Sequence, residues 1–135
     1  MNGVYDLQIL ELAVRRSLKR PTKYVHGLSR SMELYLTLPV GWKAIKDTGI
    51  ALFSPDKGGS YLVFEERPLD PRISLYCAQD VSLLFDLEAA LKRSFGSWGK
   101  NWQGRIIAAS TARVARARTS VYEGGGSRRA LAPRI

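Results

Sequence analysis

The chain has 135 residues, of which 45% are hydrophobic and 24% charged, and its 21 Lys and Arg exceed its 12 Asp and Glu by a net charge of +9. This composition is typical of a single soluble globular domain. A single Cys and a single His exclude a disulfide scaffold and a Cys/His zinc site. No apolar run approaches the roughly 18 residues of a membrane span, and we see no secretory signal.

Residues 4–19 carry apolar side chains at three- and four-residue steps, which predicts an amphipathic helix. Cations crowd its last turn, where the helix dipole favours them, and Pro21 ends it. The basic stretch that follows, up to residue 31, is interpreted as a linker.

After this linker, short alternating or apolar runs between Pro and Gly turns predict β-strands. Leu34, Leu36 and Leu38 alternate with polar neighbours, and the Pro and Gly residues of 54–59 are a strong turn signal. The predicted strands are 33–38, 49–53, 60–66, 72–77 and 103–109. Residues 110–122 fit either a strand or a basic helix, and we favour the strand.

Leucines at helical spacing predict a second helix over 81–95, with Asp80 as its N-cap. The predicted fold class is therefore α+β, an antiparallel sheet of about five strands on which the N-terminal and central helices pack. We expect three parts. They are an N-terminal helix with a basic linker (1–31), a single α+β domain (32–123) and a basic, flexible tail (124–135).

The middle of the chain resembles the PsbP-like family, the extrinsic subunits of photosystem II and their relatives. The resemblance is carried by the strand Leu34–Leu38, then Pro39-Val40-Gly41-Trp42, Ile50–Phe53, Ser54-Pro55-Asp56 and Tyr61–Phe64, and by the helix 81–95 with a return strand at 103–109. It covers residues 32–122 and implies an α/β/α sandwich, here shortened at its C-terminal end. It also implies non-enzymatic docking onto a larger assembly, photosynthetic or other.

The sequence offers catalysis few candidate groups. His26 lies in the basic linker, where a surface role is the commoner one, and Cys77 is interpreted as a buried, inert thiol. Glu65 and Glu66 are neighbours on a predicted strand, so they point to opposite faces and cannot act as a pair. We therefore expect no enzyme, no cofactor and no metal. A hydrolase that uses His26 or Cys77 is the third hypothesis.

The charge is segregated along the chain. Residues 1–32 carry a net +4, residues 33–88 a net −4 and residues 89–135 a net +9. Such segregation favours attraction to a polyanion or to an acidic protein surface. Our leading hypothesis is a small accessory subunit that docks through its basic ends onto a larger complex with an acidic face. The sequence names neither that partner nor the compartment.

The alternative is a protein that binds RNA or DNA, ribosomal or viral. Aromatic and basic residues alternate in 98–105, and such a loop can stack on bases and hold phosphates. The other interpretation, which we favour, is that the two tryptophans cover the open end of the core. The residues predicted to bind a partner under either hypothesis are Arg15, Arg16, Lys19, Arg20, Trp98, Lys100, Trp102, Arg105, Arg113, Arg116, Arg118, Arg128 and Arg129.

Overall fold

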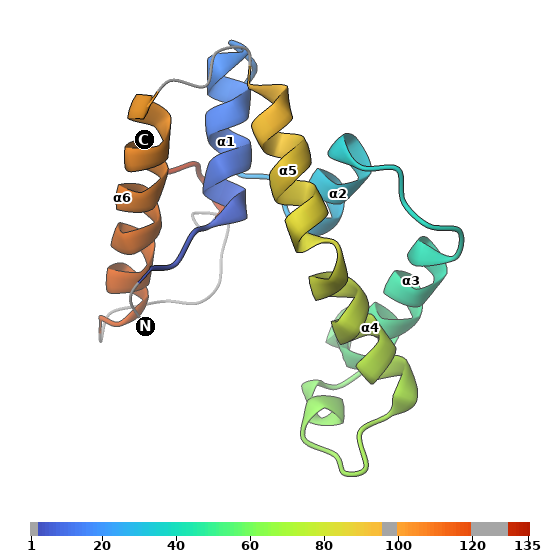
Figure 1. Ribbon diagram of the computed structural model, residues 1–135. Coiled ribbons are helices and arrows are strands. Elements are labelled where there is room, and N and C mark those ends of the chain that lie inside the picture. The colour runs from blue at the N-terminus through green and yellow to red at the C-terminus, as the bar shows by residue number, and fades with distance from the viewer. Residues whose placement is uncertain (1–2, 96–99, 120–129) are drawn as a thin grey trace. The chain divides into compact units, whose positions relative to one another are not determined.

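The computed structural model describes residues 3–95, 100–119 and 130–135. Six α-helices and two short 3-10 helices form within these ranges (Figure 1). They are α1 (Leu7–Ser17), α2 (Leu28–Tyr35), α3 (Trp42–Phe53), η1 (Pro55–Lys57), η2 (Tyr61–Phe64), α4 (Pro71–Ser82), α5 (Leu84–Ser94) and α6 (Lys100–Ala117). The only extended pairing among the described residues is an isolated antiparallel bridge between Tyr24 and Leu131.

The predicted α+β fold with an antiparallel sheet is therefore wrong. The segments predicted as strands lie largely in α2, α3, η2, α4 and α6. An alternation of three leucines over 34–38 is too short to distinguish a strand from a helix, and in the structure Leu34 is exposed on α2. Residues 110–117 continue α6, because their alanines and arginines are strong helix formers.

The helix predicted over 4–19 is confirmed as α1, and part of the helix predicted over 81–95 is present as α5. Asp80 does not cap α5, because the chain is already helical in α4 at that point. Pro71 stands in the first turn of α4. Proline is well accommodated there, and the Asp70 side chain accepts a hydrogen bond from the Arg72 N–H.

The described chain divides into two compact units. Unit 1 comprises residues 1–36 and 87–135, and unit 2 comprises residues 37–86. These units do not coincide with the boundaries expected at residues 31 and 123. The charge is divided unequally between them, since unit 1 has 16 Lys and Arg against five Asp and Glu, whereas unit 2 has five against seven. Unit 1 therefore carries a net +11 and unit 2 a net −2.

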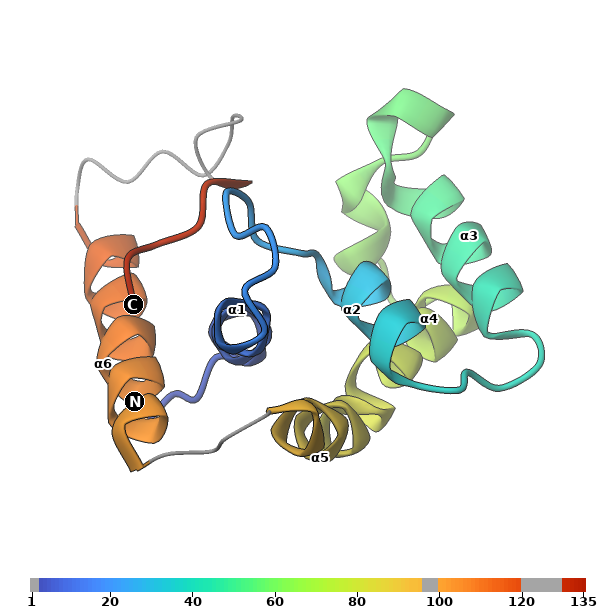
Figure 2. The same ribbon diagram turned by 90° about the horizontal axis from the view of Figure 1, so that it is seen from above.

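Helix α1 is the centre of unit 1. All seven residues from Ile9 to Arg15 are buried, so the helix is enclosed on every side rather than along one stripe. It lies beside α6, which buries Ile106 and Ser110 (Figure 2). Leu91 of α5 and Met32 of α2 are also fully buried. The Asp6 carboxylate caps the start of α1 by accepting a hydrogen bond from the Gln8 N–H at 2.9 Å.

Unit 2 is built on the pairing of α3 with α4. Gly49 of α3 lets the ring of Tyr76 approach closely, because a Cβ atom at this position would lie 2.4 Å from the ring. Beside it, Lys46 Nζ lies 2.6 Å from a carboxylate oxygen of Asp80. Phe53 packs against the rings of three aromatic neighbours, Tyr61, Phe64 and Tyr76.

Residues 130–135 lie against the connection between α1 and α2 within unit 1. The Val25 N–H donates to the Ala130 carbonyl at 2.8 Å, and the Ala132 N–H donates to the Lys23 carbonyl at 2.9 Å. Arg16 adds a hydrogen bond to the Ile135 carbonyl at 2.8 Å. The remainder of the tail expected to be flexible, residues 124–129, lies outside the described residues.

Candidate functional site

The connection between α1 and α2, residues 18–27, is fixed at its start by the backbone. Lys19 adopts a left-handed conformation (φ 54°), which turns the chain away from α1. The Arg20 N–H then donates to the Arg15 carbonyl at 2.9 Å, the bond that closes the end of many helices. We call these ten residues the basic linker. Backbone conformation and backbone hydrogen bonding thus set the direction in which the linker leaves α1.

Arg15, predicted to bind a partner, is instead an internal support of the basic linker. Its Nε donates to both carboxylate oxygens of Glu11, at 2.8 and 3.0 Å. Its two terminal nitrogens donate to the carbonyls of Pro21, at 2.6 Å, and Tyr24, at 2.9 Å. The side chain of Glu11 is fully buried and that of Arg15 nearly so. A buried charge pair of this kind needs all its hydrogen bonds to offset the loss of hydration.

Two further side chains converge on Glu11. The Tyr35 hydroxyl donates to Glu11 Oε1 at 3.3 Å. His26 Nδ1 lies 3.0 Å from the same oxygen, but without the alignment of a hydrogen bond. Burial lowers the pKa of His26, an effect that Glu11 opposes and that Arg15 and Arg30 reinforce. Burial also raises the pKa of Tyr35, and the neighbouring carboxylate acts in the same direction.

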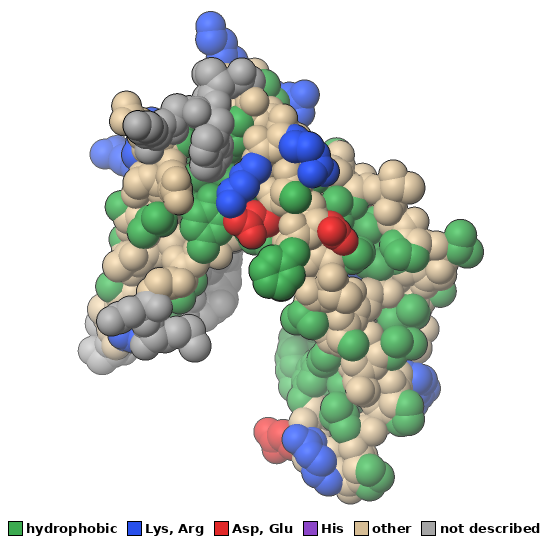
Figure 3. Space-filling model, viewed as in Figure 1, with side chains coloured by type: hydrophobic (Ala, Val, Ile, Leu, Met, Phe, Trp, Pro, Cys, Tyr) green, Lys and Arg blue, Asp and Glu red, His purple; other side chains and the backbone are tan. Residues whose placement is uncertain are grey.

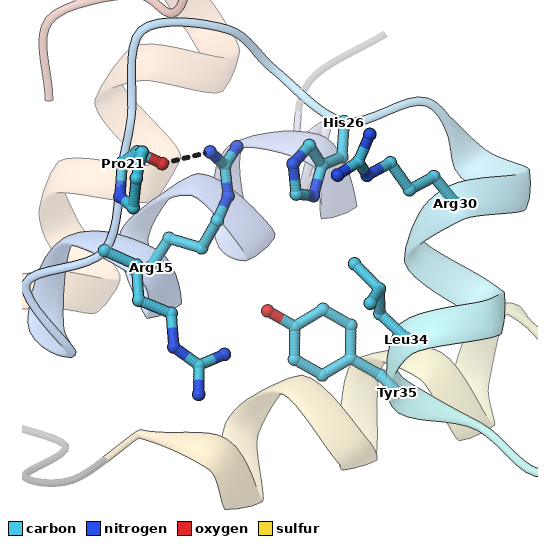
Figure 4. Close-up of a pocket in the computed structure, with 7 residues that line it drawn as sticks. Arg15, Pro21, His26, Arg30, Leu34 and Tyr35 are labelled. Carbon is cyan, nitrogen blue, oxygen red and sulfur yellow. Dashed lines mark hydrogen bonds between the residues drawn. The ribbon is translucent and has the colours of Figure 1, made fainter.

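A cavity of about 280 Å³ opens beside this cluster. It is lined by Arg15, Arg20, Pro21, His26, Arg30, Leu34 and Tyr35, all of them in unit 1. Figure 4 shows the side chains of Arg30, Leu34 and Tyr35 extending from α2 toward the basic linker. A second hollow of about 430 Å³ shares Arg15, Pro21, His26 and Arg30 with the first and is also lined by Lys23 and Tyr24. We call the first hollow the linker pocket.

Three cations besides Arg15 line the two hollows, Arg20, Lys23 and Arg30, and a fourth, Lys19, precedes Arg20 in the basic linker. All four are exposed, and none forms an ion pair with any residue that the structure describes. Lys23 Nζ lies 5.2 Å from the centre of the Tyr24 ring, a contact that leaves its charge uncompensated. On the face seen in Figure 3, most Lys and Arg side chains lie over α1, α5 and α6.

The structure also accounts for three of the other predicted basic residues by internal contacts. Arg16 donates to the carbonyls of Ile135 and Pro133, and Arg105 donates to the Ile135 carbonyl. Arg113 pairs with Asp6 at 2.8 Å and donates to Gln8 at 2.9 Å. These arginines hold the ends of the chain against α1 and α6.

The indole ring of Trp102 is engaged in contacts within the protein and is not available to stack on a base. Its ring is half-buried and packs against Phe95, with 5.7 Å between centroids. The guanidinium of Arg105 covers it at 4.4 Å. These contacts favour the interpretation that this tryptophan covers the core. Trp98, Arg128 and Arg129 lie outside the described residues, and Lys100 is described only by its place at the start of α6.

Arg116 and Arg118, at the end of α6, are exposed and make no ion pair within the described part of the chain. The hydrogen bond between Asp6 at the start of α1 and Ser110 places this end of α6 near the start of α1. The two arginines therefore lie away from the basic linker, which follows the other end of α1. The structure does not bring the predicted basic residues into one continuous site.

The sequence interpretation missed Glu11, Tyr35, Lys23 and Arg30. A signal was present for Glu11, which stands between Leu7 and Val14 on the apolar stripe and four residues before Arg15. Nothing local marked Tyr35, because its role depends on the contact between α1 and α2. Cys77 was expected to be buried, but it is exposed on α4. That expectation came from assigning the segment to a strand.

No described group of three or more His, Cys, Asp or Glu is placed to hold a metal ion. Within the described ranges, every helix is too short or too polar to cross a bilayer. Comparison with family models, curated proteins and solved structures finds no match to this chain. The resemblance to the PsbP-like family therefore has no support, and the absence of a sheet among the described residues removes the fold it implied.

Proposed function

We propose that this protein is a non-enzymatic accessory subunit that docks onto an acidic face of a larger protein complex, and that the basic linker of unit 1 makes the contact. The observation that carries the proposal is a set of four exposed cations on and beside the basic linker that have no acidic partner in the described part of the chain: Lys19, Arg20, Lys23 and Arg30. An acidic surface would be attracted to them over distances of about 10 Å at moderate salt.

The way the linker is held supports this proposal. Arg15 fixes the carbonyls of Pro21 and Tyr24, and the segment 130–132 pairs with residues 23–25. The backbone that presents the cations is thereby ordered before any partner binds. Binding then has only side chains to immobilise, which lowers its entropic cost.

Nucleic-acid binding is the second candidate function. Arg116 of α6 and Arg118 just after this helix are exposed and favour it, because arginines commonly contact phosphates. The contacts of Trp102 with Phe95 and Arg105 weigh against it, since the ring would have to leave the core to stack on a base.

The test compares two probes, a 15-residue poly-glutamate peptide and a 15-residue oligothymidylate, by fluorescence anisotropy at low salt. Replacing Lys19, Arg20, Lys23 and Arg30 together by Gln should reduce poly-glutamate affinity at least tenfold. The matched control replaces four exposed cations elsewhere, Lys43, Lys57, Arg67 and Arg93, and should reduce affinity much less. Equal losses in the two variants would contradict the proposal.

The oligothymidylate arm separates the two functions. Binding that is tighter than that of poly-glutamate and falls on Trp102→Ala, or on joint replacement of Arg116 and Arg118 by Gln, would establish the nucleic-acid alternative. Weak binding that is unaffected by both changes supports docking on a protein.

A further inference from the structure

The linker pocket contains more positive charge than the described acidic residues neutralise. Glu11 compensates Arg15, with which it shares two hydrogen bonds. Arg20 and Arg30 also line the pocket, and neither has an acidic partner among the described residues. His26 Nδ1 is a buried nitrogen without an aligned hydrogen bond. Among the described residues, the pocket therefore has two positive charges in excess.

The remaining walls of the pocket are apolar. Leu34 and Pro21 line it together with the ring of Tyr35, whose hydroxyl is occupied by Glu11. At about 280 Å³ the pocket lies at the lower limit for sites that hold small organic ligands. A ligand that matches this lining carries a group with two negative charges, attached to a short apolar or aromatic group.

We propose that the linker pocket binds a phosphomonoester group, held by the guanidinium groups of Arg20 and Arg30 with the attached apolar group against Leu34 and Pro21. This inference rests on the proposed function for the acidic character of the partner. A phosphomonoester carries nearly two negative charges at neutral pH, which matches the two uncompensated arginines, whereas a carboxylate would neutralise only one of them. Arginine is also suited to phosphate by its planar, paired donors.

His26, the only histidine of the chain, can report on ligand binding in the linker pocket. His26 faces Glu11 and Arg15 from α1 and Arg30 from α2. A dianion bound beside the ring would stabilise its protonated form. The pKa of His26 should therefore rise when the ligand binds, and no other histidine in the chain contributes to the signal.

The experiment uses phenyl phosphate as the probe and benzoate as its singly charged counterpart, with affinity measured by calorimetry and His26 followed by proton NMR. We expect one phenyl phosphate per chain, a raised His26 pKa and at least tenfold weaker binding for Arg20→Gln and for Arg30→Gln. Lys19→Gln removes an exposed neighbouring charge that does not line the linker pocket, and it should have little effect.

Three results would overturn the inference: no saturable binding at millimolar phenyl phosphate, equal affinity for benzoate, or binding that Arg30→Gln leaves unchanged. Arg30→Lys keeps the charge but loses the paired donors, so it should weaken the binding of phenyl phosphate and leave the binding of poly-glutamate unchanged. If the protein binds poly-glutamate but not phenyl phosphate, the inference about the linker pocket is wrong and the proposed docking surface stands. If it binds phenyl phosphate but not poly-glutamate, the proposed docking surface is wrong and the inference about the linker pocket stands. A phosphoserine peptide that binds more tightly than phenyl phosphate identifies a modified protein as the source, and weaker binding identifies a small metabolite.

Discussion

Replacing Glu11 by Gln should lower the free energy of unfolding by about 3–5 kcal/mol, because it leaves the guanidinium of Arg15 buried without a counter-charge. The carboxylate is fully buried, and Arg15 is only 6% exposed. Glutamine keeps one oxygen as an acceptor for Arg15 or Tyr35, so the loss should fall near the lower end of this range. Against a total stability of about 5–15 kcal/mol, even that loss is large.

The matched control is another pair of oppositely charged residues four apart on a helix. Lys43 and Asp47 of α3 lie 3.8 Å apart, with side chains 79% and 56% exposed. Asp47→Asn should cost less than about 0.5 kcal/mol, because water already screens the pair. The contrast isolates burial as the cause, since both pairs have the same spacing in sequence.

The assay is urea unfolding followed by the helical circular dichroism signal, with the slope against denaturant compared among variants. The double variant Glu11→Leu, Arg15→Met removes both charges and should be less destabilised than Glu11→Gln. It should not recover wild-type stability, since it also loses the bonds to the Pro21 and Tyr24 carbonyls. A Glu11→Gln loss below about 1 kcal/mol would refute the reasoning that this pair supports unit 1.

Three further predictions concern the histidine, a pair of helical glycines and the cysteine. Burial holds the pKa of His26 below its ordinary value of 6.5, so the unfolded chain binds the proton more tightly. The free energy of unfolding should therefore fall as the pH drops below about 6.5, and His26→Asn should flatten that dependence; a His26→Asn profile as steep as wild type would contradict it. Gly49→Ala should destabilise the protein by about 1–3 kcal/mol, because its Cβ would meet the Tyr76 ring at 2.4 Å. Gly104→Ala, with nothing within 4 Å, should stabilise α6 by about 0.5–1 kcal/mol, and thermal melts that rank the two variants in the opposite order would refute this packing. Cys77 is exposed, so it should react with a thiol reagent in the native protein; reaction only after unfolding would show that it is buried.

Local patterns in the sequence were sufficient to predict α1 and most of α5. Apolar residues recur at helical spacing in both, and cations gather in the last turn of each. The strand predictions failed where an apolar run was too short to define a period. Residues 49–53 and 72–77 are examples, since five or six mixed apolar residues fit either a helix or a strand.

The candidate site was less predictable than the helices. Its basic character follows from composition, and Arg20 and Lys19, two of the residues predicted to bind a partner, are exposed. Which arginines are free depends on contacts between distant parts of the chain. Arg113 reaches Asp6 across 107 positions, and Arg16 reaches Ile135 across 119. No pattern of neighbouring residues contains that information.

The measurement that tests the central claim most directly is a residue-by-residue map of binding by heteronuclear NMR. The protein, labelled with ¹⁵N, is titrated with the 15-residue poly-glutamate peptide. If the basic linker is the docking surface, the largest shifts should fall on residues 18–30, including the side-chain Nε signal of Arg30. Shifts concentrated instead at Arg116 and Arg118, or spread evenly over the cations of both units, would contradict the account.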